Sequence, residues 1–374
     1  MADRIILQLL MGPTLPIPVP AELSNALQSA QVTTAVGSPS GFQLTFAVSK
    51  NSIITTTLLA AGFFDPRIRV ILVVIFNGTP HVLMDGIITK HDMTPSNDPR
   101  QSTFTVTGED LTKLMSYEQR TFPWSGAPAP AQVAAICATY FPYGIVPVTV
   151  PPVRAFMPSA NEQQDVQTSL NDLDYINKLA SNNGYTFYIT PGPAPGTNIA
   201  YWGPEVRAGA PQPALTVNSD AATNVDTLSF SVDGNASTEY TGSVRVPFTH
   251  LYVDIPIPDV SLVKPPLAAR RVEALTKKRL GNVATLDLVQ AMLVGLDRTA
   301  ATTDAVTAQG TLDVVRYGSI LTARSVVGVR GASIAHDGTY YVRSVTSNLK
   351  RGQFTQSFSL SRDGLGPTLP RVMT

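Results

Sequence analysis

A single hairpin signal places the strongest constraint on how this chain folds. The run Ile68–Phe76 is apolar except at Arg69, and Asn77-Gly78 follows it directly. Asn-Gly is the dipeptide best suited to a two-residue hairpin turn, because both turn residues need positive φ. Val82–Ile88 supplies a returning strand. The segment therefore predicts two adjacent antiparallel strands within a sheet.

Alternating large apolar residues extend this sheet on both sides of the hairpin. Phe42, Leu44, Phe46 and Val48 recur with period two, and residues 102–107 alternate in the same way. This is the pattern of a strand with one buried face. Residues 1–118 are therefore predicted to form a first β-barrel, closed or split, completed by strands within residues 225–260.

Helices are predicted between two strand-rich ends of the chain. Residues 131–140 form an alanine-rich helix and residues 144–150 a strand. In residues 169–189, an apolar face repeats every three residues. Ser169 with Asp172 predicts the start of this helix, Asn182-Asn183-Gly184 its end, and residues 185–189 an aromatic strand.

The later part of the chain returns to strands. Strands are predicted in residues 225–232, 243–246, 250–257, 319–329, 339–346 and 353–361. A basic helix is predicted in residues 267–280, after a proline linker, and a further helical stretch in residues 286–296.

The predicted fold class is mainly β with inserted helices (α+β), built as two similar β-barrel domains plus helical insertions. The expected domains after residue 118 are a helix-strand insertion contributing to the second barrel (119–224), strands, linker and basic helix (225–300), and strands closing the second barrel (301–374).

The charge of the chain favours association with other proteins. Only 14% of residues are charged, and 27 basic residues balance 27 acidic ones. Weak charge repulsion suits a subunit within an assembly, whereas a nucleic-acid binder needs excess positive charge. Cys137 is the only cysteine and is predicted to lie in the core. Ile5–Met11 is predicted to be a first strand rather than a signal peptide, and no run is long enough to span a membrane.

Residues for catalysis, cofactor binding or metal binding are not apparent. The four histidines, His81, His91, His250 and His336, lack partners at metal-ligand spacing. The acid pairs Asp172/Asp174 and Glu109/Asp110 are predicted to serve helix starts, since Asp172 and Asp174 point to different faces of a helix. We therefore expect no enzymatic activity, no cofactor and no metal site.

One basic cluster is a candidate docking site for an acidic partner. Cations in the last turn of a helix complement its dipole, but Arg270 and Arg271 would lie in the first turn, where that explanation fails. The candidate protein-docking residues are Arg270, Arg271, Lys277, Lys278 and Arg279.

Several motifs together resemble a known family. Residues 172–176 (Asp-Leu-Asp-Tyr-Ile) and 184–188 (Gly-Tyr-Thr-Phe-Tyr) resemble a segment of phage late control D proteins, and of the N-terminal hub region of valine-glycine repeat (VgrG) spike proteins. Asn183 replaces the more usual acid before the glycine. Residues 340–346 with 352–358 resemble the closing barrel of such hubs, and residues 86–89 with 104–110 resemble the first barrel.

The resemblance implies a structural baseplate hub of a contractile phage tail or tail-like injection system. Such a hub is a homotrimer that joins a hexameric inner tube protein to a trimeric spike, and contacts other baseplate subunits. Because the sequence stops at Thr374, the spike is expected on a separate chain. The protein would assemble in the cytoplasm into a particle or virion baseplate, without binding nucleic acid or inserting into a membrane.

Two alternatives stay open. One is a baseplate-associated cell-wall hydrolase, which would need converging carboxylates. The other is a receptor- or glycan-binding particle protein, with Tyr140, Tyr143, Tyr201 and Trp202 as a sugar platform. The proline-rich arm, residues 13–20, is predicted to reach a neighbouring subunit by adding to a sheet edge.

Overall fold

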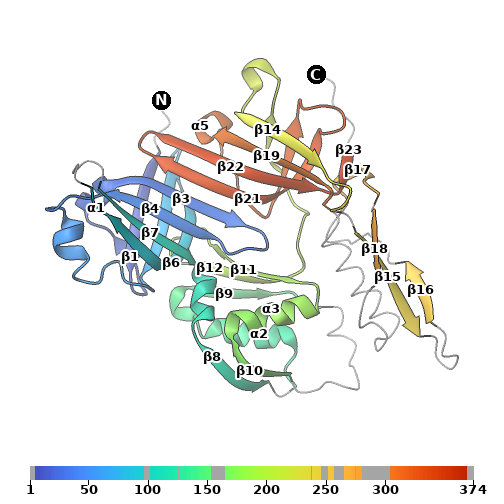
Figure 1. The fold of residues 1–374 in the computed structure, drawn as a ribbon, viewed down its shortest axis with the longest axis horizontal. Coiled ribbons are helices and arrows are strands. Elements are labelled where there is room, and N and C mark those ends of the chain that lie inside the picture. The colour runs from blue at the N-terminus through green and yellow to red at the C-terminus, as the bar shows by residue number, and fades with distance from the viewer. Residues whose placement is uncertain are drawn as a thin grey trace. The chain divides into compact units, whose positions relative to one another are not determined.

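The computed structural model describes residues 5–96, 102–124, 126–152, 165–236, 238–245, 252–256, 265–273, 275–279 and 304–368. The chain divides into two compact units. Unit 1 comprises Met1–Ser181, Thr186–Gly203 and Thr346–Thr355, and unit 2 comprises Asn182–Tyr185, Pro204–Val345 and Gln356–Thr374. Strands dominate both units and helices are inserted among them, as predicted (Figure 1).

The main sheet of unit 1 is antiparallel. Its strands follow the order β21-β3-β4-β7-β6-β5-β1-β2, where β21 contributes only its last residues, from Thr346 onward, to this unit. The strand beside β3 therefore comes from the end of the chain and not from residues 225–260. The strands are β1 (Ile6–Gly12), β2 (Ile17–Pro18), β3 (Leu27–Ala35), β4 (Gly41–Ala47), β5 (Arg69–Phe76), β6 (Thr79–Thr94), β7 (Thr103–Asp110) and β21 (Gly338–Lys350).

The hairpin predicted at Asn77-Gly78 is confirmed. Phe76 pairs with Thr79, so two residues form the loop. Asn77 has φ 50° and Gly78 has φ 82°, both positive as the tight hairpin turn requires. Strand β5 is buried along nearly its whole length, which explains its continuous apolar sequence.

The main sheet of unit 1 does not close into a barrel within the described residues. The strands at the two edges of this sheet, β2 and β21, do not pair with each other. Strand β2 contains only Ile17 and Pro18, and Pro16, Pro18 and Pro20 lack the amide hydrogen that a continuing ladder needs. The proline arm folds back on β1 at this edge, because Leu10 pairs with Pro18 and Met11 with Ile17.

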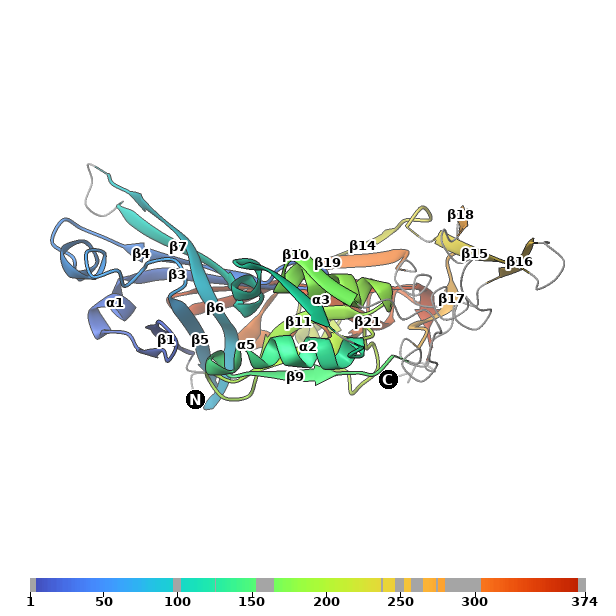
Figure 2. The same ribbon diagram turned by 90° about the horizontal axis from the view of Figure 1, so that it is seen from below.

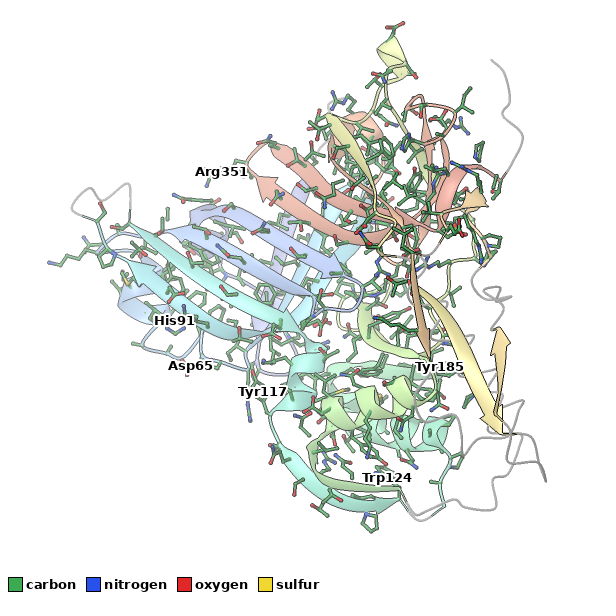
Figure 3. The ribbon with its side chains drawn as sticks, turned by 45° about the vertical axis from the view of Figure 1, so that its right-hand side comes forward. Asp65, His91, Tyr117, Trp124, Tyr185 and Arg351 are labelled. Atoms are coloured by element: carbon green, nitrogen blue, oxygen red, sulfur yellow. The ribbon has the colours of Figure 1, made fainter. Side chains whose placement is uncertain are left out.

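Aromatic side chains fill the core over β4 and β7. Phe64 lies in the segment after the π-helix η1 (Ile54–Leu58) and meets Phe104 edge-on, with ring centroids 4.8 Å apart. Phe46 lies 6.1 Å from Phe64. His91 on β6 (labelled in Figure 3) joins this cluster. Its ring packs against the Phe104 ring, and its Nδ1 lies 3.1 Å from the Phe64 carbonyl oxygen. This histidine therefore has a packing role.

The helical insertion of unit 1 is a small layered structure. Helices α2 (Ala129–Ala138) and α3 (Asp172–Asn182) cover one face of a three-stranded sheet, in the order β11-β12-β9 (Figures 1 and 2). Beneath them Trp202 is fully buried. The hydroxyl of Tyr175 on α3 donates to Gln132 Oε1 on α2 at 2.6 Å. The other elements are η2 (Leu111–Ser116), β8 (Gln119–Trp124), η3 (Phe141–Tyr143), β9 (Ile145–Thr149), β10 (Asp165–Asn171), β11 (Thr186–Pro191), β12 (Asn198–Gly203) and α1 (Ala21–Ala26).

The predicted end of α3 is correct, whereas its predicted start is wrong. The helix ends at Asn182, and Gly184 adopts φ 66°. Ser169 does not cap the helix; it lies in β10 with φ 50°. The Asn171 side chain accepts from the Asp174 amide at 2.8 Å instead. Asn171 is also an effective capping residue, so the sequence offered two competing starts.

Unit 2 is a second β-rich unit. Its largest sheet follows the order β14-β19-β22-β21-β20-β13, and it too has two unjoined ends among the described strands. Phe358 and Leu360 on β22, a strand predicted from the sequence, are buried. The described elements are β13 (Gln212–Thr216), η5 (Asp220–Ala222), β14 (Thr227–Val232), β15 (Thr238–Arg245), β16 (Tyr252–Pro256), β17 (Ala268–Arg271), β18 (Thr276–Arg279), β19 (Val306–Asp313), α5 (Val314–Tyr317), β20 (Val326–Arg330), β22 (Gln353–Arg362) and β23 (Gly364–Pro367).

The basic helix predicted in residues 267–280 is wrong. The segment forms strands β17 and β18 instead, and β17 pairs with β23 near the end of the chain. A Cβ at Gly364 would lie 2.1 Å from the Arg270 carbonyl oxygen, so the glycine permits this close approach. A partner almost a hundred positions away thus overrides the local preference for helix. The second helical stretch, residues 286–296, lies outside the described residues.

Candidate protein-interaction surface

A buried ion pair lies between neighbouring strands of unit 1. Arg69 on β5 donates from Nε to Asp85 Oδ1 at 2.8 Å, and from Nη2 to Asp85 Oδ2 at 2.7 Å. Both side chains are about 1% exposed or less. Asn198 on β12 donates to Asp85 Oδ2 at 2.8 Å. A buried charge must be paired and hydrogen-bonded to be tolerated, and here both requirements are met.

The remaining donors of Arg69 hold three loop segments. Nη1 donates to the Thr14 carbonyl at 2.8 Å, and Nη2 donates to the carbonyls of Tyr143 at 2.8 Å and Gly196 at 3.2 Å. These carbonyls come from the proline arm, the turn before β9 and the turn before β12. One guanidinium group therefore fixes segments that are far apart in the sequence.

Large apolar side chains are exposed next to these three segments. Leu15 follows Thr14, Phe141 lies two residues before Tyr143, and Ile199 follows the turn at Gly196. On the neighbouring strands Val146 pairs with Ile199. The exposed fractions of the side chains in this group, which we call the apolar rim, are Leu15 79%, Phe141 71%, Ile17 65%, Val146 52%, Val148 43% and Ile199 40%.

The apolar rim has the character of a protein-binding surface. Single exposed apolar residues are ordinary, but six of them on the segments that Arg69 holds and on the adjoining strand β9 are unusual for a monomer. Tyr201 lies beside Val148 in the pairing of β12 with β9, and its ring stacks on Tyr188 at a centroid distance of 5.1 Å. Burial, followed by the neighbouring Tyr188, raises the pKa of Tyr201 to about 12.

The predicted basic docking residues are distributed over two sheets of unit 2. Arg270 and Arg271 lie on β17, and Lys277, Lys278 and Arg279 lie on β18. Arg270 and Lys278 are exposed. The Nε of Arg271 lies 3.4 Å from Asp363 Oδ2. The five residues therefore do not share a helix face, and their role in docking stays a prediction.

The predicted sugar platform is wrong. Trp202 is fully buried, and it points to the opposite side of β12 from Tyr201 because successive residues of a strand alternate. Tyr140 donates its hydroxyl hydrogen to Asp172 Oδ2 at 2.9 Å. The Tyr143 ring lies against Arg69, with the guanidinium carbon 5.7 Å from the centroid. These four side chains do not form one face.

Within the part of the chain that the structure describes, the acid pairs Asp172/Asp174 and Glu109/Asp110 have structural roles. Asp172 is fully buried and accepts from Tyr140, from Gln167 Nε2 at 3.0 Å and from Arg120 Nη2 at 2.6 Å. Asp174 is exposed beside Asn171, so the two carboxylates do not converge. Asp110 caps η2 by accepting from the Thr112 amide, as predicted. The described residues contain no cluster of potential metal ligands and no helix long and apolar enough to cross a membrane.

Cys137 is predicted to be chemically inert in the folded protein. Burial, with a smaller contribution from Asp172, raises the pKa of the Cys137 thiol to about 12, and only the thiolate is a good nucleophile. We expect iodoacetamide at pH 8 to leave Cys137 unmodified in the native protein and to alkylate it fully in 6 M urea. Mass spectrometry of both samples would show this, and rapid native labelling would contradict the core position of the thiol.

A second buried charge cluster lies in unit 2. Arg207 donates to both carboxylate oxygens of Asp304, with Nη2 2.8 Å from Oδ2. Its Nε lies 3.5 Å from Glu205 Oε1, and its guanidinium carbon lies 5.0 Å from the Tyr341 ring centroid. Ser361 donates to Asp304 at 2.8 Å. The cluster joins segments of unit 2 that are far apart in the sequence, and no local motif marks it.

Comparison of the fold identifies its class. A tail protein from Neisseria meningitidis superimposes with a TM-score of 0.61 at 12% sequence identity, covering 97% of this chain and 98% of that one. The 43 kDa tail protein of prophage MuSo2 from Shewanella oneidensis gives 0.61 at 13% identity, covering 97% and 100%. A chain of the Francisella PdpA–VgrG complex gives 0.60 at 12% identity, covering 99% of this chain and 55% of that one. The protein has the fold found in these tail proteins.

No family model matches the sequence, and no curated protein matches it by sequence comparison. The likeness therefore concerns the fold over nearly the whole chain. It agrees with the tail-protein and VgrG resemblance seen in the motifs, while late control D membership stays a prediction.

Proposed function

We propose that this protein is a structural, non-enzymatic subunit of a phage tail or tail-like injection system, acting as a homotrimeric baseplate hub. The observation that carries the proposal is the apolar rim, which gives a tail-protein fold a surface for a second copy of the chain. The fold likeness to whole tail proteins and the low charge of the chain support the same role.

The partners follow from the resemblance to hub proteins. A trimer whose subunits each supply two β-rich units presents six such units in a ring, which suits a hexameric inner tube on one side. The other side suits a trimeric spike. Assembly would take place in the cytoplasm of the producing cell, where other baseplate subunits join.

The mass of the purified protein in solution tests this proposal. We expect light scattering to give about three times the chain mass of 39.9 kDa. Phe141→Asp combined with Ile199→Asp is expected to leave a monomer, because each substitution forces a charge into an apolar interface, where desolvation costs several kcal/mol. The matched control is Ile334→Asp in unit 2, since Ile334 is 74% exposed but lies outside the apolar rim.

A monomeric wild-type protein that stays monomeric with a trimeric spike protein would contradict the trimer. A double variant that keeps the wild-type mass would show that the apolar rim is not the interface. Thermal unfolding of each variant checks that the substitutions, all at exposed positions, leave the fold intact.

A further inference from the structure

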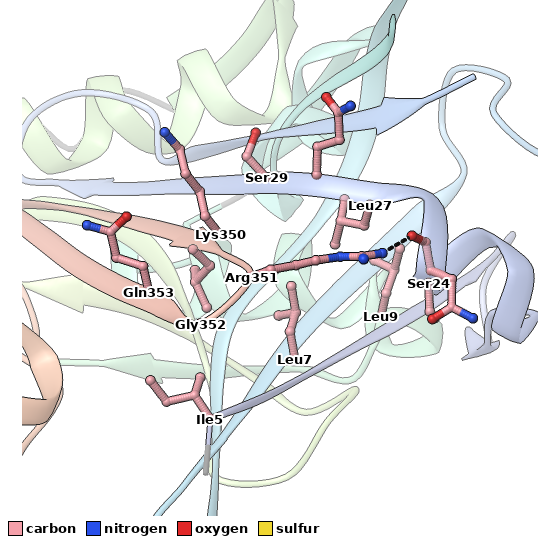
Figure 4. Close-up of a pocket in the computed structure, with 13 residues that line it drawn as sticks. Ile5, Leu7, Leu9, Ser24, Leu27, Ser29, Lys350, Arg351, Gly352 and Gln353 are labelled. Carbon is pink, nitrogen blue, oxygen red and sulfur yellow. Dashed lines mark hydrogen bonds between the residues drawn. The ribbon is translucent and has the colours of Figure 1, made fainter. Parts of the chain in front are cut away.

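A pocket of about 330 Å³ lies in unit 1 between the two ends of its main sheet. Strand β1 forms one wall and the start of β3 the other, and the turn between β21 and β22 lies over them (Figure 4). Its apolar lining comes from Ile5, Leu7, Leu9, Leu27 and Leu349. This is the position where the sheet fails to close.

Strand β1 presents to this pocket an edge that is occupied from Leu9 to Met11 but not at Leu7. The Leu9 carbonyl accepts from the Val19 amide at 3.1 Å, so the outward backbone groups of Leu9 are met by the proline arm. Backbone groups in a strand alternate in direction, so those of Leu7 point to the same side as those of Leu9. Strand β2 pairs only with Leu10 and Met11. Within the described residues, no strand lies beside Leu7 on this side.

The rim of the pocket is positively charged. Lys350 and Arg351 are exposed at the turn, and Arg351 donates to the Asn25 carbonyl across the pocket mouth (Figure 4). A guanidinium has five N–H donors, so others stay available to a ligand. The polar lining otherwise comes from serine, asparagine and glutamine, and no acidic side chain is among the lining residues. The positive charge at this rim therefore favours a ligand that carries a carboxylate.

We propose that this pocket binds an extended peptide segment of a partner protein, which adds as a strand beside β1. Backbone groups of the segment would pair with those of Leu7, and its apolar side chains would enter the space lined by Leu9, Leu27 and Leu349. An aspartate or glutamate of the segment would bind Lys350 and Arg351. Strand addition gains affinity from main-chain hydrogen bonds and specificity from alternate side chains. The proposal goes beyond the hub assignment and does not depend on it.

Binding of a synthetic probe tests the proposal with the full chain in its natural oligomeric state. The probe is a fluorescein-labelled octapeptide of alternating valine and threonine with one central glutamate. We expect saturable binding by fluorescence polarisation, with a dissociation constant below about 1 mM. Hydrogen exchange measured by mass spectrometry is expected to slow in residues 5–9 when the peptide binds.

Two altered peptides and three protein variants isolate the parts of the interaction. A peptide with glutamine in place of glutamate, and the variant Arg351→Gln, are each expected to bind about tenfold more weakly, the size of a charge-assisted hydrogen bond. Arg351→Lys should retain most of the binding. A peptide N-methylated at alternate backbone positions should not bind, because it cannot form the strand hydrogen bonds. Lys178→Gln, at an exposed cation on α3, should bind as the wild type does.

Specific outcomes would overturn the proposal. They are no saturable binding, equal binding of the N-methylated peptide, or binding that leaves exchange in residues 5–9 unchanged. Equal affinity for the glutamate and glutamine peptides would remove the role of Lys350 and Arg351. The melting temperature of Arg351→Gln, which loses the contact to the Asn25 carbonyl, separates a binding effect from unfolding.

Discussion

Asp85→Ala is expected to lower the free energy of unfolding of unit 1 by about 3–5 kcal/mol, because it leaves the Arg69 guanidinium buried without its counter-charge. Arg69 would also lose the group that orients it towards the carbonyls of Thr14, Tyr143 and Gly196. The variant should therefore both unfold at lower urea and assemble poorly. Both tryptophans, Trp124 and Trp202, lie in unit 1, so their fluorescence during urea unfolding reports on this unit.

An exposed pair on the same hairpin provides the control. Lys90 and Asp92 on β6 form an ion pair of 2.8 Å, but their side chains are 67% and 50% exposed. Asp92→Ala should change stability by less than about 1 kcal/mol. The double variant Arg69→Met with Asp85→Leu should recover much of the lost stability, since an apolar pair needs no counter-charge. If Asp85→Ala proved as mild as Asp92→Ala, the buried pair would not be what holds the three loops.

Arg207→Met is expected to destabilise unit 2 by a comparable amount, about 3–5 kcal/mol. Asp304 and Glu205 would keep their charges in a largely buried position, and Arg343, which lies 3.8 Å from Asp304 and 3.4 Å from Glu205, is itself 37% exposed and a weaker counter-charge. Faster hydrogen exchange in β20 and β22, with unit 1 unchanged, is the expected measurement. Unchanged exchange in unit 2 would contradict a stabilising role for the cluster.

The same cluster predicts a loss of stability in acid. Burial opposes the ionisation of Asp304, but the charge and hydrogen bonds of Arg207 outweigh it, so the pKa of Asp304 is lowered. A carboxyl whose pKa is lower in the folded state stabilises the fold above its unfolded pKa, and this stabilisation is lost as pH falls through the folded value. Unit 2 of the wild type should therefore weaken below about pH 4. In Asp304→Asn that part of the pH dependence should disappear.

The parts of the fold that could be predicted from the sequence are those set by local chemistry. The Asn77-Gly78 turn, the alternation in β4 and the end of α3 at Asn182 each depend on a few neighbouring residues. The basic strands β17 and β18 could not be predicted in this way. Their conformation depends on pairing with β23 and β15, which come from other parts of the chain.

The candidate interaction surface around the apolar rim could be predicted only in part from the sequence, for the same reason. Arg69 is the one charge in an apolar run, and Asp85 lies diagonally across from it on the same face of the hairpin. A bulge between Leu72 and Val73 shifts the register by one residue, and without it Asp85 would lie on the opposite face. The sequence predicts the hairpin but not this pairing. The convergence on Arg69 of the segments that carry Leu15, Phe141 and Ile199 was not predictable either, because it requires three loops to meet in space. The same holds for the pocket beside Leu7.

The contribution of the β21–β22 hairpin to unit 1 has a consequence for synthesis on the ribosome. Residues Thr346–Thr355 belong to unit 1, and Thr346 shares a hydrogen bond of 3.0 Å with Thr33, 313 positions earlier. Translation adds about 5–20 residues per second. The strand that pairs with β3 is therefore synthesised many seconds after β3 itself. A polypeptide that ends before Thr346 lacks the strand that pairs with β3. The chain must therefore be translated beyond Thr355 before unit 1 can be complete, so shorter fragments cannot fold this unit fully.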